Sequence, residues 1–325
     1  MKKNIASFVK IPDSILSKVY LKLFQEKSSL STFLFHGLFR DEKERLLDLV
    51  DPQPWITVEQ FHQFVDYYLD HDYIFVSPDD VMSGLKNHSH YVMITFDDGY
   101  YNNLYALPVL QKYDIPAVFF ISTNHVTHNK SFWWDVVYRE RKKAGRSTKE
   151  IVREQNELKT KTAEAIEEYL QRTFGEQALE PQGDIDRPFT PRELREFSKE
   201  SNVFLGNHTS DHAILTNYDP DAIKSQIRAA QDTLRSITGM TPLAISYPNG
   251  NYSDRIIKIS REAGIELGIT IGCRKNYLPF TDKNVDRMRL NRFDITGSDN
   301  ILAQCELFRS DVLLYPLILN ALKRT

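Results

Sequence analysis

The stretch Tyr91-Val-Met-Ile-Thr-Phe-Asp-Asp-Gly-Tyr100 combines a short apolar run with two adjacent carboxylates and a glycine. A near-continuous apolar run of this length is typical of a strand buried on both faces of a parallel sheet. Neighbouring carboxylates repel each other, and a bound cation relieves that repulsion, with one carboxylate as ligand and the other free as a base. An Asp-Asp-Gly turn or helix cap explains the same residues equally well, so this pattern alone leaves both interpretations open.

Other apolar runs of the chain also end in polar residues or glycine. They are Ser31–Phe35 before His36, Ala117–Ile121 before Ser122, Val203–Gly206 before Asn207, Leu243–Ser246 before Tyr247, and Leu267–Ile271 before Gly272. Helical patterns lie between these runs, over Asn102–Tyr113, from a capping box at Thr190, over Asp219–Ile237 and over Ser253–Gly264. The alternation predicts an α/β fold whose site lies where the strands end.

One segment departs from this alternation. Residues 138–186 are rich in Lys, Glu, Arg and Gln, and Ile151, Leu158, Ile166 and Leu170 recur at helical spacing. We expect one or two amphipathic helices there, inserted into a single domain that spans residues 1–325, with their charged faces in solvent. A lid over the substrate or an oligomer contact is the alternative role for this helical insertion.

Composition narrows the class of protein. The chain has 325 residues, a net charge of -3 and 41% hydrophobic residues, which suffices for a packed core without the basic excess of a nucleic-acid binder. No run reaches the ~20 apolar residues of a membrane span, and the first residues lack the continuous apolar core of a signal peptide. Cys273 and Cys305 are expected to be free thiols, and Val312–Leu322 to form a docked terminal helix. These features together predict a cytoplasmic protein.

His208 and His212 form the second candidate group. Residues four apart share one face of a helical turn, so both imidazoles could reach one metal ion if the segment is helical. Two imidazoles, one carboxylate and a position left for water make up the catalytic zinc pattern. The spacing alone fits two solvated loop histidines as well. The stretch Ser246–Gly250 is likewise either a simple turn or the source of a backbone N–H for a developing oxyanion.

Together these motifs resemble those of the polysaccharide deacetylase family, also called the NodB-homology domain or carbohydrate esterase family four. Thr95–Tyr100 is similar to the first motif, His208-x-x-x-His212 to the second, and Leu243–Gly250 to a variant of the third that lacks its arginine. The resemblance extends from about Phe33 to Ile295. It implies a distorted (β/α) barrel and hydrolysis of N-acyl groups, typically N-acetyl groups, on amino sugars.

The resemblance also implies a role for each matched residue. Asp98, His208 and His212 would bind the metal, usually Zn²⁺ or another divalent transition metal. Asp97 would be the general base, and Tyr247 would offer its backbone N–H to the oxyanion. The implied substrate is a glycan that contains amino sugars, or a lipid-linked or nucleotide-linked sugar.

The third motif departs from the common family pattern. The arginine that would hold the catalytic aspartate is replaced by Ser246. We expect Arg292 or Arg289, from the later stretch Met288–Asp294, to supply the guanidinium group instead.

A second departure concerns the general acid. The late Leu-x-His motif of the family is missing, and no histidine follows His212. His36 and His125 are the candidates for this role, although each could be an ordinary loop histidine. Otherwise Asp97 shuttles the proton itself.

Two further questions stay open at the level of sequence. The aromatic stretch Phe132-Trp133-Trp134-Asp135 could stack on sugar rings or pack the inserted helices. The same scaffold could also hydrolyse another small amide, as a deformylase does, or bind a glycan without turnover.

Overall fold

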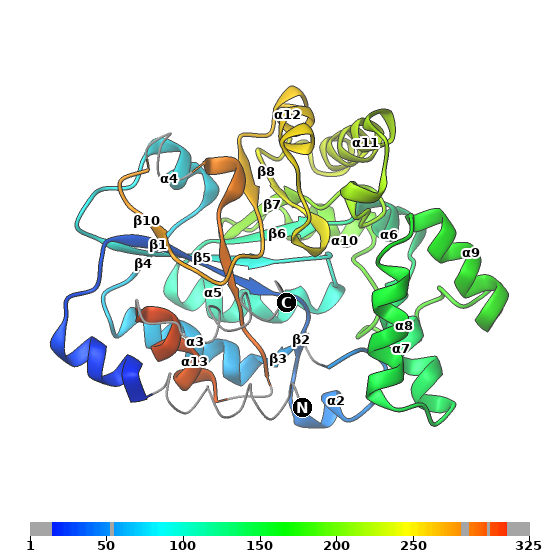
Figure 1. Ribbon diagram of the computed structural model, residues 1–325, viewed down its shortest axis with the longest axis horizontal. Coiled ribbons are helices and arrows are strands. Elements are labelled where there is room, and N and C mark those ends of the chain that lie inside the picture. The colour runs from blue at the N-terminus through cyan, green and yellow to red at the C-terminus, as the bar shows by residue number, and fades with distance from the viewer. Residues whose placement is uncertain (1–14, 53–54, 281–285, 298–299, 311–325) are drawn as a thin grey trace, which may run out of the picture.

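A curled, mainly parallel sheet forms the centre of the protein (Figure 1). The computed structural model describes residues 15–52, 55–280, 286–297 and 300–310, so the predicted helix over Val312–Leu322 lies outside the described residues. The sheet has the order β10-β1-β5-β6-β7-β8-β9, with β11 also paired to β1 and β4 to β5. The strands are β1 (Ser29–Phe35), β4 (Ile74–Phe75), β5 (His90–Phe96), β6 (Ala117–Ile121), β7 (Val203–Asn207), β8 (Ala244–Ser246), β9 (Leu267–Ile269), β10 (Asn276–Tyr277) and β11 (Arg292–Asp294).

The central strands run parallel and end at a common edge. Phe96 at the end of β5 is paired with Phe35 of β1, and Ile121 at the end of β6 is paired with Asn207 of β7. β10 is the antiparallel strand of this sheet. A separate short pair joins β2 (Leu38–Phe39) to β3 (Ile56–Thr57). The predicted α/β fold is therefore confirmed, and the polar residues that follow the strands gather at one end of the sheet.

A late segment of the chain joins the two ends of the sheet. Leu290 forms a parallel bridge with Ile269 of β9, and Arg292 of β11 is in register with Thr32 of β1. This short pairing closes the sheet into the distorted barrel that was expected. It also carries Arg292 into the barrel interior, where its side chain is buried.

Helices cover the sheet on both sides (Figure 1). In that view α3 (Val58–Leu69), α5 (Leu107–Tyr113) and α13 (Ile301–Arg309) lie below the sheet, and α11 (Pro220–Thr238) and α12 (Asp254–Glu262) lie above it. The shorter helices are α2 (Glu42–Arg45), α4 (Pro78–Ser83), α6 (Thr123–His128) and α10 (Pro191–Phe197). None of the described helices has the length and hydropathy that crossing a bilayer requires.

Local sequence signals explain where several helices begin. The capping box at Thr190 is present, with Glu193 bonded to the Thr190 backbone and Pro191 as the first residue of α10. The predicted helix over Asn102–Tyr113 is instead a 3₁₀ helix (Tyr101–Ala106) followed by α5. Pro108, which has no N–H to donate, stands in the first turn of α5 and favours a helix start there.

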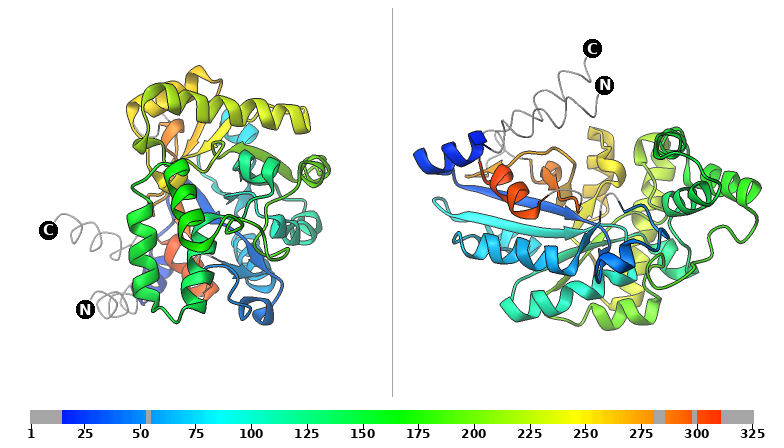
Figure 2. Two further views of the ribbon diagram at one scale, coloured as in Figure 1. Left: turned by 90° about the vertical axis from the view of Figure 1, so that its right-hand side faces the viewer. Right: turned by 90° about the horizontal axis from the view of Figure 1, so that it is seen from below.

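The helical insertion consists of α7 (Trp133–Lys143), α8 (Thr148–Leu158) and α9 (Ala163–Phe174), and so begins before the expected residue 138. Figure 2 shows these helices side by side at one end of the molecule. They share an apolar cluster that includes Val136, Ile151, Ile166 and Leu170. The cluster gives the insertion its own small core, as the helical spacing of these residues predicted. Both cysteines are free, which confirms that expectation.

Candidate metal centre and active site

Asp98, His208 and His212 converge at the carboxyl ends of β5 and β7. Their candidate ligand atoms all lie within 4.8 Å of one another. The Nε2 atoms of His208 and His212 are each 3.4 Å from the same oxygen, Oδ1 of Asp98. The structure therefore brings together the three residues that the sequence nominated as metal ligands.

The two histidines meet through a turn rather than through one face of a helix. Thr209 and His212 both have left-handed backbones, with φ values of 64° and 50°. The turn is stabilised from inside, because Asn207 Oδ1 accepts from Thr209 N at 2.8 Å and Thr209 Oγ1 accepts from Ala213 N at 2.8 Å. The two imidazoles therefore reach the same carboxylate without the helical turn that the spacing alone would require, because these local hydrogen bonds hold the backbone in another conformation.

The hydrogen bonds around Asp98 and His208 leave ligand atoms free for a divalent cation. Oδ1 of Asp98 is buried and accepts no hydrogen bond within the described part of the chain, although two imidazole nitrogens face it. His208 Nδ1 lies 2.8 Å from the Ser246 carbonyl oxygen, a contact that places the proton on Nδ1 and leaves the Nε2 lone pair free for a metal. Two imidazoles and a carboxylate form the donor set of a catalytic zinc site.

Asp97 is held by a guanidinium group from a much later segment of the chain, Arg292 of β11. Arg292 Nη1 donates to Asp97 Oδ1 at 2.8 Å, and Nη2 donates to Oδ2. Ser246 Oγ donates to Asp97 Oδ2 at 3.0 Å, and Thr95 Oγ1 accepts from Arg292 Nη1 at 3.1 Å. Arg289, the other candidate, is 40% exposed and pairs with acidic residues away from Asp97. Of the two arginines proposed from sequence, Arg292 is the one in contact.

The environment keeps both aspartates ionised. Burial alone would raise the pKa of Asp97, but the Arg292 guanidinium and the nearby His208 outweigh it and hold the pKa well below its usual value. Burial opposes ionisation of Asp98 too, yet the approach of His208 and the charge of His212 lower its pKa. Asp97 thus enters any reaction as a carboxylate that can accept a proton.

The two candidate acids lie at different places around this centre. His36 directly follows β1, and because Phe35 is in register with Phe96, His36 lies at the same end of the barrel as Asp97. Its Nδ1 is buried and has no hydrogen-bond partner among the described residues. His125 of α6 is bonded to Ser122 Oγ at 2.8 Å, and burial lowers its pKa to about 4. Both histidines thus lie near the centre, since His125 lines a pocket together with His212, and His36 differs in that its Nδ1 has no partner in the described part of the chain.

The backbone of Tyr247 does not offer a free donor. Its N–H donates to the Ile269 carbonyl oxygen at 3.1 Å, as part of the pairing between β8 and β9. The phenol is buried too and donates to the Met288 carbonyl at 3.2 Å. This contradicts the expected oxyanion role of Tyr247, because the ladder between neighbouring strands already uses the amide.

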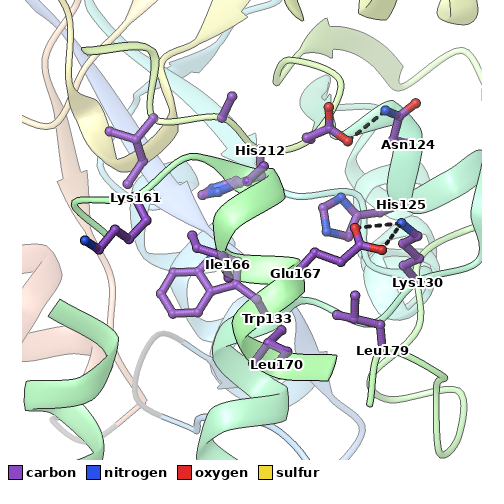
Figure 3. Close-up of a pocket in the computed structure, with 14 residues that line it drawn as sticks. Asn124, His125, Lys130, Trp133, Lys161, Ile166, Glu167, Leu170, Leu179 and His212 are labelled. Atoms are coloured by element: carbon purple, nitrogen blue, oxygen red, sulfur yellow. Dashed lines mark hydrogen bonds and ion pairs between the residues drawn. The ribbon is translucent and has the colours of Figure 1, made fainter. Parts of the chain in front are cut away.

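A pocket opens beside His212, between the barrel and the helical insertion (Figure 3). Two of its charged groups form an ion pair, in which Lys130 Nζ lies 2.8 Å from both oxygens of Glu167. Apolar side chains supply much of the remaining wall, among them Trp133, Ile166 and Leu170. The insertion therefore borders the metal centre instead of standing apart from it in solvent.

The residues of the aromatic stretch Phe132–Trp134 differ in whether they pack the protein core or lie near the metal centre. Trp133 is buried in the apolar cluster of the insertion, whereas Phe132 is buried in a separate cluster that includes Trp55 and Tyr100. Trp134 is partly exposed, and its ring centroid lies 4.6 Å from that of His212. Sequence reasoning missed this contact, and also the participation of Thr95 and Ser246, since nothing in the local pattern separates Trp134 from its buried neighbours.

The comparisons with known proteins agree with this geometry. The family profile described as Polysaccharide deacetylase matches residues 84–268, which is more than half of the chain. The chain belongs to the polysaccharide deacetylase family. A Bacillus subtilis relative, YxkH, whose name places it among polysaccharide deacetylases, is 21% identical over 180 residues, which cover 55% of this chain and 44% of that protein. The chain thus matches less than half the length of this curated relative.

Solved structures show the same fold at low sequence identity. The Streptococcus pyogenes deacetylase PplD, solved in complex with acetate, matches 87% of this chain and 99% of its own, with a TM-score of 0.59 and 18% identity. BC0361, a polysaccharide deacetylase from Bacillus cereus, matches 87% and 69% of the two chains, with a TM-score of 0.59 and 14% identity. IcaB from Ammonifex degensii matches 87% and 98%, with a TM-score of 0.55 and 17% identity. At these identities the likeness establishes the distorted barrel.

Proposed function

We propose that the protein is a metal-dependent hydrolase that removes N-acyl groups, typically N-acetyl, from amino sugars in a glycan or a glycan precursor. One observation carries the proposal: the Asp98–His208–His212 group, of which Asp98 and His208 are buried, lies directly beside Asp97, which is held by Arg292. Membership of the polysaccharide deacetylase family supports the class of substrate.

The metal site and the base divide the work between the two neighbouring carboxylates. Asp98, His208 and His212 would hold the cation, which when bound lowers the pKa of water and polarises an acyl carbonyl. Asp97 Oδ2 lies 3.7 Å from His208 Nε2 and so stands next to the cation position without belonging to the three-residue group. There it accepts the proton of the attacking water.

The groups around Asp97 keep it oriented during this transfer. The two nitrogens of Arg292 fix both carboxylate oxygens, and Ser246 donates to one of them. His36 is the group that we assign to protonate the leaving amine, because it follows β1 at the same end of the barrel as Asp97 and its Nδ1 has no partner among the described residues. The amide of Tyr247 is bonded to Ile269, so we do not assign it a role in stabilising the oxyanion.

Acetate release tests this proposal directly. The protein is loaded with Zn²⁺, its metal content is measured, and oligomers of N-acetylglucosamine are supplied as substrate. We expect one zinc per chain and acetate release that His212→Gln abolishes and the exposed control Arg289→Gln leaves unchanged. Stoichiometric zinc without acyl release across a panel of N-acylated glycans would instead identify a glycan-binding barrel. Release from small non-sugar amides alone would identify a deformylase-like hydrolase.

A further inference from the structure

We propose that Trp134 forms the sugar-binding platform of the active site, so that the helical insertion contributes directly to substrate recognition. The inference rests on the proposed function for the identity of the ligand, an N-acetylated sugar. It assigns the binding of the sugar ring to a residue that lies outside the three sequence motifs.

Trp134 is placed where a platform is needed. Its indole lies 4.6 Å from the imidazole of His212, measured between ring centroids, and is inclined to it by 59°. It stacks at 5.1 Å and 22° on Phe132, which is fully buried, so the ring is supported from within the protein. Trp134 as a residue is partly exposed. A sugar whose N-acyl group reaches the metal centre therefore passes beside this ring.

A buried hydrogen-bond chain fixes the orientation of the indole. Trp134 Nε1 donates to the Tyr100 hydroxyl at 2.9 Å, and that hydroxyl donates to Asp135 Oδ2 at 2.6 Å. The other oxygen of Asp135 accepts from Asp51 N at 2.9 Å. Tyr100 and Asp135 are both fully buried, so the chain is shielded from competition by water.

This chain also joins the platform to the catalytic motif. Tyr100 closes the stretch that contains Asp97 and Asp98, whereas Trp134 and Asp135 begin the insertion at the start of α7. The position of the ring relative to the metal ligands is thus set by residues next to those ligands. A ring held in this way loses little conformational entropy when it binds a ligand.

The chemistry of an indole face suits a pyranose ring. Its flat apolar surface packs against the C–H face of the sugar, and the polar sugar hydroxyls stay at the rim. The Nε1–H is already used by Tyr100, so the ring contributes surface rather than a hydrogen bond to the ligand. The platform therefore selects for a ring on the substrate and is indifferent to the acyl group.

The kinetics of Trp134 variants distinguish a role in sugar binding from a role in folding. We expect Trp134→Ala to raise KM for an N-acetylglucosamine tetramer on the order of ten-fold, because one aromatic contact is lost, while zinc content stays stoichiometric. Hydrolysis of a small thioester without a ring, such as ethyl thioacetate, should fall far less than hydrolysis of the tetramer, because such a substrate does not use the platform. Trp134→Phe keeps the packing on Phe132 and should recover part of the affinity. The exposed aromatic Tyr277, which is paired with Ser29 at the start of β1 and therefore lies away from the carboxyl ends of the strands, provides the control variant Tyr277→Ala.

Tryptophan fluorescence of the metal-free protein measures binding of the sugar to Trp134 in the absence of hydrolysis. The chain has three tryptophans, and we expect the tetramer to shift the emission of the wild type and of Trp133→Phe but not that of Trp134→Phe. An unchanged KM in Trp134→Ala, or a sugar-induced shift that survives in Trp134→Phe, overturns the platform. If the wild type shows the fluorescence shift but releases no acetate, Trp134 still binds the sugar and the proposed hydrolase activity is wrong.

Discussion

Arg292 and Asp97, which are far apart in sequence, form a bidentate ion pair in the interior of the barrel. Nη1 lies 2.8 Å from Oδ1, Nη2 contacts Oδ2, and both side chains are buried. A buried pair of this kind is strongly destabilised when one partner is removed, because the other charge is then left without compensation. The pair therefore links the stability of the barrel to the ionisation state of the proposed base.

Replacing Asp97 by asparagine separates catalysis from metal binding. The amide keeps the size of the side chain but cannot accept the proton of water, so we expect Asp97→Asn to lower kcat by roughly 10²-fold or more. Zinc stoichiometry should be retained, because Asp98, His208 and His212 are unchanged. Acetate release and metal content are measured on the same sample. Wild-type turnover in this variant would remove Asp97 from the role of base.

Weakening the ion pair should shift the pH profile. Arg292 lowers the pKa of Asp97 against the opposing effect of burial, so Arg292→Lys, which loses the bidentate geometry, should raise that pKa. Because the base acts as a carboxylate, we expect the acid limb of kcat/KM to move to higher pH. Arg289→Lys, at an exposed arginine outside this contact, is the control. A profile that does not move in Arg292→Lys would show that Arg292 does not tune the base.

The same pair predicts how stability depends on pH. Asp97 has a lowered pKa in the folded state, so its contribution is present above the unfolded-state pKa of about 3.9 and is lost as the pH falls towards the folded value. The difference in the free energy of unfolding between wild type and Arg292→Lys should be largest near neutral pH and should shrink in acid. Urea unfolding at several pH values measures it. A difference that grows as the pH falls would contradict this linkage.

Metal binding should stabilise the folded chain. A ligand that binds only the native state adds about 2.7 kcal/mol at roughly 100 times its Kd, so we expect zinc to raise Tm and a chelator to reverse the rise. His212→Gln removes one of the three proposed ligands and should abolish most of the effect. His128→Gln, at an exposed histidine outside the site, should leave it intact. An equal rise in Tm for His212→Gln would place the zinc elsewhere.

Gly206 tests the packing beneath the metal ligands. It precedes Asn207 and His208 at the end of β7, and an added Cβ would lie 2.2 Å from the Phe120 ring. Because β6 and β7 are paired at this point, the ring has little room to move, and we expect Gly206→Ala to cost about 1–3 kcal/mol of stability. Gly183→Ala, whose Cβ would meet nothing within 4 Å, is the control. Equal melting temperatures for the two variants would refute this interpretation of the packing.

The order of strands and helices followed from the sequence because its signals are local. The apolar run of β5 is continuous, and Thr190 with Pro191 and Glu193 marks a helix start through bonds within one turn. The bounds of the insertion were less well predicted, because Trp133–Tyr138 reads as an aromatic cluster and becomes helical through packing on α8 and α9. The cytoplasmic location remains a prediction that no structural feature tests.

The sequence by itself determined the chemistry of the site: which carboxylates and imidazoles are present, that they follow buried strands, and that the resulting donor set suits a divalent metal. Only the tertiary structure decided which residues from distant parts of the sequence contact these carboxylates and imidazoles. Arg292 rather than Arg289 reaches Asp97 because β11 closes the barrel against β1, and Trp134 rather than Trp133 faces His212 because α7 buries one indole and leaves the other partly exposed. Such choices depend on how separate segments pack against each other, and local residue patterns do not encode that packing.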